Sequence, residues 1–345
     1  MTRRQMLIAA AAMARGARAA EAPRSPNLGT APTGFGLHLR AAREAGQPVD
    51  MVDLAQSLGL GVVETRLTAT DAEAVKALRA KIDGYGMRLI LDTPLPRAEN
   101  DVERFDTAVA ACKNAGAISL HAAMTQRRYE EFDTFDAFKA KFEACQKQVA
   151  WAEPVLRKHR IKLGIENHKG WRSVEQATWM KRVSSEWIGV HLDFGNNVSL
   201  CEDPEDTLAN LAPYAVGCHL KDMAVQPYDD GFLLSEVPLG EGILDLPKWV
   251  RTLQARDPRM PFDLETITRD PLKIPIFTKK YWATFDDSYS PLPGRDLART
   301  FEIVRKHPPK SPLPKITGLS VAEQGRLEDE NNRKSIEYAR GRLGL

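Results

Sequence analysis

Short apolar runs alternate with longer amphipathic segments from residue 34 to about residue 306. This alternation is typical of parallel βα units, in which each strand is followed by a helix. Eight runs are strand candidates, at residues 34–40, 61–67, 87–93, 117–123, 161–168, 187–194, 216–222 and 260–266. Eight parallel strands with intervening helices predict an α/β fold, a closed (β/α)8 barrel over residues 34–306.

Several segments between and after these runs carry their own signals. The stretch from Asp71 to Gly86 predicts a helix, because it starts with acidic residues and ends at a glycine. Pro154 should kink or divide a long helix that begins near Phe135. Residues 269–294 are too long for a simple connection and are expected to form a functional lid. Residues 307–345 predict a linker and a charged C-terminal helical extension.

The first 22 residues have the order of an export signal. Arg3 and Arg4 precede an apolar stretch over residues 6–14, and small residues follow it. Paired arginines in this position are typical of the twin-arginine type, and the stretch is too short to span a bilayer. This predicts a periplasmic protein without membrane attachment after cleavage. A misread start codon or a basic arm is the alternative, and the protein would then be cytoplasmic.

Composition narrows the classes of partner. The chain has 345 residues, of which 43% are hydrophobic and 27% charged, and its net charge is +2. Such a balance argues against nucleic acid or an anionic membrane as a partner. The four cysteines lack paired close spacing, so neither a zinc knuckle nor a dense disulfide framework is indicated, and one disulfide remains open.

Polar side chains gather where the predicted strands end, which is where barrel enzymes place their active sites. Residues two apart in a strand point to the same side, so each pair can face the barrel mouth. The later strands contribute Glu166 with His168, His191 with Asp193, His219 with Lys221, and Glu265; the earlier strands contribute His38, Glu64, Asp92 and His121. Each residue alone could be a helix cap or half of an ion pair. A metal site built from two glutamates, an aspartate and a histidine would be rich in oxygen, with one nitrogen. Such a set of donors is typical of Mn²⁺, Mg²⁺ or Co²⁺ sites, whereas the other kind of site, a zinc centre rich in thiolates, needs cysteines.

The motifs "GIENH", "GVHLDFGN", "GCHLKD" and "FDLET" resemble those of the xylose isomerase-like TIM barrels, a superfamily of metal-dependent sugar isomerases and epimerases. The resemblance covers roughly residues 34–306. It implies one divalent ion, with Mn²⁺ first and Mg²⁺, Co²⁺ or Zn²⁺ as alternatives. The implied ligands are Glu166, Asp193, His219 and Glu265. Glu166 and Glu265 would also be the proton-handling pair, and His168 and Lys221 are further catalytic candidates.

Other residues are candidates for contact with a sugar. These substrate-binding candidates are His38, Glu64, His121, His191, Asn196, Tyr281 and Trp282. His121 and His191 could equally be structural, and the two aromatic residues could stack on a sugar or pack beneath a lid. Asn196 departs from many ketose epimerases, which carry histidine there, so the substrate contacts of that branch do not transfer.

The resemblance predicts an isomerase or epimerase that acts on an unphosphorylated sugar or keto-sugar through an enediolate. Loss of a group β to the carbonyl from the same enediolate would instead make a lyase or dehydratase, for example one acting on 3-keto-glycosides. A non-catalytic sugar-binding barrel is a further alternative. The apurinic endonuclease branch fits poorly, because the chain is nearly neutral and has only 7 histidines. Barrels of this kind often form homo-oligomers, but the sequence identifies no interface.

Overall fold

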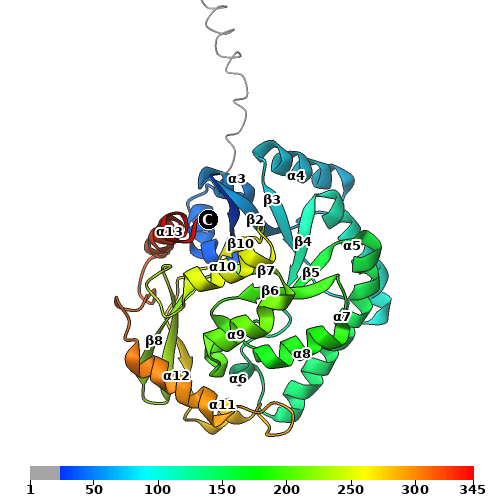
Figure 1. Cartoon of the computed structure of the whole chain (residues 1–345). Coiled ribbons are helices and arrows are strands. Elements are labelled where there is room, and N and C mark those ends of the chain that lie inside the picture. Colours follow the sequence, from blue (N-terminus) through cyan, green and yellow to red (C-terminus); the bar gives the residue numbers. More distant parts are fainter. Residues whose placement is uncertain (1–23) are drawn as a thin grey trace, which may run out of the picture.

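Eight parallel strands form a closed barrel in the computed structural model, which describes residues 24–345 (Figure 1). The order around the barrel is β1-β10-β7-β6-β5-β4-β3-β2, so the first strand closes the barrel against the last. The strands are β1 (Ser25–Thr30), β2 (Leu60–Arg66), β3 (Arg88–Asp92), β4 (Ala117–Ala122), β5 (Lys162–Glu166), β6 (Ile188–Asp193), β7 (Ala215–Leu220) and β10 (Phe262–Leu264). The predicted (β/α)8 fold is therefore confirmed. The export signal proposed for residues 1–22 lies outside the described residues.

The first predicted strand is wrong. Residues 34–40 do not form a strand; they lie in η1 (Pro32–Phe35) and α2 (Gly36–Glu44). The strand is instead "SPNLGT", in which Leu28 pairs with Phe262 of β10. This segment is mostly polar or small and contains a proline, so it lacks the enrichment in β-branched and aromatic residues that identifies strands.

Helices surround the barrel and bury its outer face. They are α3 (Met51–Ser57), α4 (Ala72–Tyr85), α5 (Val102–Asn114), α7 (Phe135–His159), α8 (Ser173–Val183), α9 (Pro204–Leu211) and α10 (Leu246–Arg256); η2 (Glu99–Asp101), α6 (Arg128–Glu131), η3 (Asn196–Leu200) and η4 (Ala212–Tyr214) are short turns between them. The helix expected from Asp71 is confirmed, because Asp71 caps α4 and Gly86 ends it with φ of 61°. Pro154 does not divide α7, which runs unbroken through it. Across residues 24–345, no helix combines the length and apolar character needed to span a membrane.

A small antiparallel sheet lies beside the barrel and was not predicted. It consists of β8 (Asp222–Tyr228), β9 (Gly231–Val237) and β11 (Leu272–Ile274), and α12 (Gly294–Lys306) packs against β8 (Figure 1). Met223, Phe232, Leu234 and neighbouring residues form a second hydrophobic cluster beneath it. Strands β8 and β9 follow β7 in the chain, and β11 follows β10. The sheet therefore lies at the end of the barrel where the barrel strands terminate.

The segment expected to be a lid contains β11 and α11 (Lys279–Trp282), and it is fastened to the barrel helices. The fully buried Arg128 donates to Thr284 Oγ1 at 2.9 Å and to Ser290 Oγ at 2.6 Å. The same guanidinium forms an ion pair with Glu175 at 3.1 Å. These contacts hold residues 284–290 in one position.

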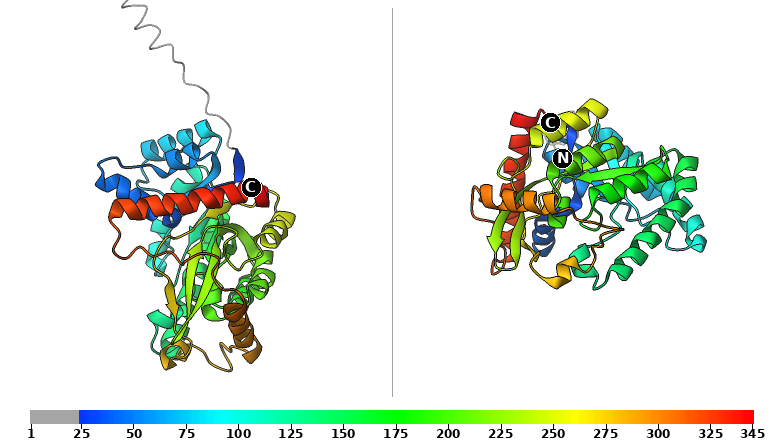
Figure 2. Two further views of the ribbon diagram at one scale, coloured as in Figure 1. Left: turned by 90° about the vertical axis from the view of Figure 1, so that its left-hand side faces the viewer. Right: turned by 60° about the horizontal axis from the view of Figure 1, so that its bottom comes forward.

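The C-terminal extension packs back onto the start of the barrel. Helix α13 (Val321–Tyr338) lies along α2, and the π-helical turn η5 (Ala339–Leu343) follows it (Figure 2). Two hydrogen bonds fasten α13 here: Asn332 Nδ2 donates to the Gly34 carbonyl of η1 at 2.8 Å, and the His38 amide of α2 donates to Glu328 at 2.7 Å. The earliest and latest helices described in the chain are thus neighbours.

Candidate metal centre

Four side chains from consecutive barrel positions converge at one end of the barrel. Glu166, Asp193 and His219 lie at or next to the carboxyl ends of β5, β6 and β7, and Glu265 directly follows β10. Each offers one ligand atom, and these atoms all lie within 4.8 Å of one another. All four residues are buried, the most exposed being Glu265 at 5%. The structure therefore brings together the four residues that the sequence suggested as ligands.

His219 stands between two of these acids and a third carboxylate. Its Nδ1 lies 3.6 Å from Glu166 Oε1 and 3.4 Å from Glu265 Oε2, whereas its Nε2 donates to Glu64 Oε2 at 3.0 Å. Burial alone would lower the pKa of His219, but the carboxylates of Glu265 and Glu64 outweigh it and hold the pKa well above its ordinary value. His219 Nδ1 has no hydrogen-bond partner among residues 24–345. A cation is the natural partner for a buried imidazole nitrogen that faces two carboxylates.

A buried ammonium group touches the same acids. Lys221 Nζ lies 2.6 Å from Asp193 Oδ2 and 2.5 Å from Glu265 Oε2. Burial works to lower the pKa of Lys221, but Asp193 and Glu265 raise it above its ordinary value. For Glu265 the balance is the reverse: burial works to raise its pKa, and His219 and Lys221 bring it far below the ordinary range. Both groups are therefore charged at neutral pH.

Asparagines hold the ligand carboxylates in place. Asn196 Nδ2 donates to Glu166 Oε1 at 2.9 Å, and the Asn196 amide donates to Asp193 Oδ1 at 2.8 Å. Asn167 exchanges two hydrogen bonds with the backbone of Asp193, at 2.7 and 2.8 Å. Asn196 also accepts from the ammonium of Lys169. Asn167 and Lys169 were missed in the sequence, although Asn167 stands in the motif "GIENH" and Lys169 follows it directly.

A second layer of ionisable groups lies deeper in the barrel. The rings of His121, His191 and His219 are neighbours, with centroids 4.3 to 4.9 Å apart. His121 Nδ1 donates to Asp92 at 2.8 Å, and its Nε2 lies 3.4 Å from Glu166 Oε2. His191 is fully buried, neither of its ring nitrogens has a hydrogen-bond partner among residues 24–345, and burial holds its pKa well below the ordinary value. His191 is therefore neutral, and the layer meets the ligand set at Glu166 through His121 and at His219 through the rings of His121 and His191.

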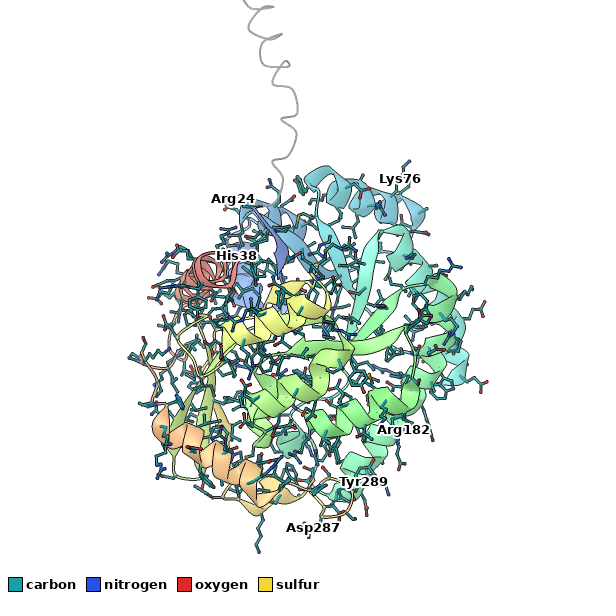
Figure 3. All side chains as sticks on the ribbon, in the orientation of Figure 1. Arg24, His38, Lys76, Arg182, Asp287 and Tyr289 are labelled. Atoms are coloured by element: carbon teal, nitrogen blue, oxygen red, sulfur yellow. The ribbon has the colours of Figure 1, made fainter. Side chains whose placement is uncertain are left out.

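The remaining candidates lie apart from this cluster. His38 is on α2, outside the barrel (Figure 3), where its Nδ1 hydrogen-bonds with Asp329 Oδ1 of α13 at 2.8 Å. Tyr281 is buried and donates to the Ser199 carbonyl at 3.0 Å, while Trp282 Nε1 donates to the Ile276 carbonyl at 2.7 Å. These two aromatic residues pack in the second hydrophobic cluster. His168 Nδ1 donates to the Thr125 carbonyl at 2.6 Å, which fixes the ring at the rim of the site.

A cavity of about 270 Å³ adjoins the ligand set. His121 forms part of its wall and its Nε2 lies 3.4 Å from Glu166 Oε2, so one side chain separates this cavity from a proposed ligand. Its other lining residues are Arg66, Asp92, Thr93, Pro94, Ala122 and Ala123. The volume suits a small molecule and is too small for a folded partner.

All four cysteines are unpaired and buried, so the disulfide left open by the sequence is absent from residues 24–345. Burial raises the pKa of Cys112 and of Cys145 to about 11. Thiols with such values are protonated at neutral pH and are poor metal ligands. The candidate centre therefore consists of oxygen and imidazole donors.

Comparison of the chain with known proteins finds a matching family model and two relatives in sequence. Residues 52–283 match the family model described as "Xylose isomerase-like TIM barrel". The chain is 23% identical over 217 residues to the uncharacterized protein YihM of Escherichia coli, which covers 62% of this chain and 64% of YihM. It is 27% identical over 106 residues to the 3-oxo-isoapionate decarboxylase of Pectobacterium atrosepticum. The aligned region covers 30% of this chain and 38% of that enzyme. The matches thus span less than two thirds of either relative.

Solved structures share the fold. A xylose isomerase-like TIM barrel protein from Mycobacterium smegmatis in complex with magnesium has a TM-score of 0.52 at 15% identity, covering 81% of this chain and 98% of that one. A D-psicose 3-epimerase, solved in the presence of D-fructose, has a TM-score of 0.51 at 12% identity, covering 92% and 100%. The probable 3-DHS dehydratase AsbF from Bacillus anthracis has a TM-score of 0.51 at 14% identity, covering 69% and 91%.

Proposed function

Because the chain belongs to the xylose isomerase-like TIM barrel family, we propose that it is a divalent-metal-dependent isomerase or epimerase of an unphosphorylated sugar or keto-sugar. The observation that carries the proposal is the convergence of Glu166, Asp193, His219 and Glu265, whose ligand atoms lie within 4.8 Å of one another beside a small cavity. Three carboxylates and one imidazole suit Mn²⁺ first, and Mg²⁺, Co²⁺ or Zn²⁺ also fit this donor set.

The proposed chemistry divides between the ion and the side chains. A divalent ion held by the four ligands would polarise a substrate carbonyl and its neighbouring hydroxyl. Glu166 and Glu265 project from opposite parts of the ligand set and are our candidates for removing and returning the proton on the carbon next to that carbonyl. Each has one oxygen already bonded to a neutral donor, Asn196 for Glu166 and Thr33 for Glu265. Those bonds fix each carboxylate, and the other oxygens face Lys221 for Glu265 and His121 for Glu166.

His168 and Lys221 are further catalytic candidates in this proposal. Lys221 lies within 2.6 Å of two ligand carboxylates, so it can also supply a proton to a substrate oxygen beside the ion. The Thr125 carbonyl accepts from His168 Nδ1, so Nε2 is the ring nitrogen that remains to bond a substrate hydroxyl in this proposal. His121 and Asn196 contact the same ligands and are candidates for binding substrate, whereas His191 and Glu64 serve better as structural and orienting groups.

A lyase remains the alternative, and one observation favours it. The Lys221 ammonium is a proton donor at the reacting centre, which is what expulsion of a hydroxyl or glycosidic oxygen requires. A dehydratase shares the fold and a decarboxylase is among the sequence relatives. We further propose that residues 1–22 direct export to the periplasm, where 3-keto-glycosides are plausible substrates for such a reaction.

Proton NMR in D₂O separates these functions. The protein, loaded with Mg²⁺, is offered a panel of ketoses and 3-keto-glycosides. Solvent deuterium in a rearranged but intact sugar supports the isomerase or epimerase, and release of the aglycone with an unsaturated keto-sugar supports the lyase. If no deuterium enters any substrate and no stoichiometric metal is found by elemental analysis, the chain is a binding protein and both proposals fail.

A further inference from the structure

Lys169 is a buried cation beside the ligand set without a carboxylate of its own. It is 2% exposed, and the hydrogen-bond partner of its ammonium is the amide oxygen of Asn196. No carboxylate among residues 24–345 lies within ion-pair distance of it, although Glu236 and Asp193 act from farther away to raise its pKa. Burial lowers the pKa of Lys169, and the neighbouring Lys221 lowers it further. A buried charge without an opposite charge is costly, so it calls for a partner.

The other cations at this end of the barrel are already engaged. Lys221 bonds to Asp193 and Glu265. Arg269 forms two hydrogen bonds with Glu236, at 2.6 and 3.3 Å. Within residues 24–345 the buried cations Arg128, Arg172 and Lys221 all form ion pairs, and Lys169 is the buried cation that does not.

The backbone of Lys169 is also unusual. Its φ is 51°, in the left-handed region that side chains other than glycine and asparagine rarely adopt. The conformation is held by the Arg128 amide, which donates to the Lys169 carbonyl at 3.1 Å. Backbone strain of this kind concentrates at sites where a side chain must be aimed for function. From this backbone the ammonium reaches the amide oxygen of Asn196.

The position of Lys169 relative to the ligands limits what it can bind. Asn196 bridges the two, accepting from Lys169 and donating to Glu166 Oε1 at 2.9 Å. A single amide group thus separates the ammonium from a metal ligand. A molecule that reaches both must carry its negative charge within a few bonds of its metal-chelating oxygens.

We propose that Lys169 binds a carboxylate of the substrate, so that the substrate class is a keto-sugar acid. This inference rests on the proposed function and specifies its substrate. A carboxylate matches the site because it brings one negative charge to one free ammonium and forms a charge-assisted hydrogen bond. A phosphate would bring more charge and need several further donors, which Lys221 and Arg269 do not offer while they are paired.

Matched ligands test the proposal on Mn²⁺-loaded protein. D-Fructose and 2-keto-D-gluconate differ only at carbon 1, and D-fructose and D-fructuronate differ only at carbon 6. We expect at least one acid to bind about tenfold more tightly than D-fructose in calorimetric titration. In Lys169→Met this preference should disappear, while the Kd for D-fructose stays within about twofold. Lys181→Met, which removes an exposed lysine from α8, is the control and should keep the preference.

Other outcomes overturn the inference. An acid preference that is absent in the natural protein, or that survives in Lys169→Met, excludes Lys169 as the anion anchor. Equal loss of D-fructose and acid binding in the variant would assign Lys169 a purely structural role. If Lys169→Met does not fold, a crystal structure of the natural protein with the tighter acid decides, because the carboxylate must lie within hydrogen-bond distance of Lys169 Nζ. Manganese binding, measured on the same samples, reports separately on the proposed function.

Discussion

Glu64 accepts a hydrogen bond from His219 Nε2 at 3.0 Å, on the side of the imidazole opposite to the nitrogen that faces Glu166 and Glu265. A carboxylate in this place fixes the orientation of the ring and keeps the proton on Nε2, so that Nδ1 is free to coordinate an ion. The sequence suggested that Glu64 contacts substrate. Its geometry supports a positioning role instead.

Glu64→Gln should therefore weaken metal binding without removing a ligand. We expect affinity for Mn²⁺ to fall about 10- to 100-fold, the usual effect of losing an outer hydrogen bond to a ligating histidine. Calorimetric or EPR titration of chelator-treated protein measures it. Glu73→Gln, an exposed acid on α4, should leave the affinity unchanged, and equal affinities in the two variants would contradict the positioning role.

Glu265→Gln should abolish stabilisation by metal. If the ion binds only the folded state, adding it at about 100 times its Kd stabilises the natural protein by roughly 3 kcal/mol. The variant loses a charged ligand and should show little or none of this gain. Thermal unfolding with EDTA and with Mn²⁺ gives the comparison, and Glu143→Gln at the surface of α7 is the control. A natural protein that Mn²⁺, Co²⁺ and Mg²⁺ all fail to stabilise has no metal site.

Lys221→Met should destabilise the metal-free protein more than the metal-loaded one. Without an ion, the Lys221 ammonium is the charge that contacts both Asp193 and Glu265, and its removal leaves the buried Asp193 without an ion pair and Glu265 with His219 alone. Breaking a buried pair in this way costs about 3 to 5 kcal/mol. A bound cation would offset most of that loss. Denaturant midpoints with EDTA and with Mn²⁺ test this, with the exposed Lys76→Met as control (Figure 3); equal losses under both conditions would contradict it.

Glu328 makes stability depend on pH at the contact between α13 and α2. Burial raises the pKa of Glu328 to about 7 from 4.5. A carboxyl group whose pKa is raised by folding holds its proton more tightly in the folded state, so its unfavourable effect grows as pH rises from about 4.5 through about 7. Glu328→Gln should therefore stabilise the protein by about 1 to 3 kcal/mol at pH 8 and have little effect at pH 4.5. Unfolding at both pH values measures this.

Glu330→Gln is the matched control for that experiment, because Glu330 is exposed on the same helix and pairs with Lys334 at the surface. It should change stability by less than about 0.5 kcal/mol at either pH. A destabilised Glu328→Gln at pH 8 would show instead that the carboxylate is charged and needed by the His38 amide.

The ligand residues could be anticipated because each follows a short apolar run, and parallel strands that end together place such residues together. Strand β1 could not be predicted, because "SPNLGT" has a single large apolar side chain. Its identity as a strand depends on pairing with β10. That error placed His38 at the barrel mouth. The β8–β9 hairpin had a usable signal in "YDDG", a turn sequence between two apolar stretches.

The role proposed for Lys169 could not be predicted from the sequence, for a different reason. Lys169 lies three residues after the end of β5, in a turn. The path of this turn is set by the hydrogen bond from the Arg128 amide and by the close packing of Gly170 against Thr125. Those partners are distant in sequence. The absence of a counter-charge is likewise a property of the surroundings, which only the three-dimensional arrangement reveals.

The closure of β1 against β10, together with the pairing of α2 and α13, has a consequence for biosynthesis. During translation the first strand emerges from the ribosome long before the strand that completes the barrel, and α2 emerges long before its partner helix. Contacts between such distant segments form slowly, because a long loop must close first. The growing chain should therefore expose one edge of β1 until β10 has been synthesised, and an unpaired strand edge is a site at which aggregation can begin.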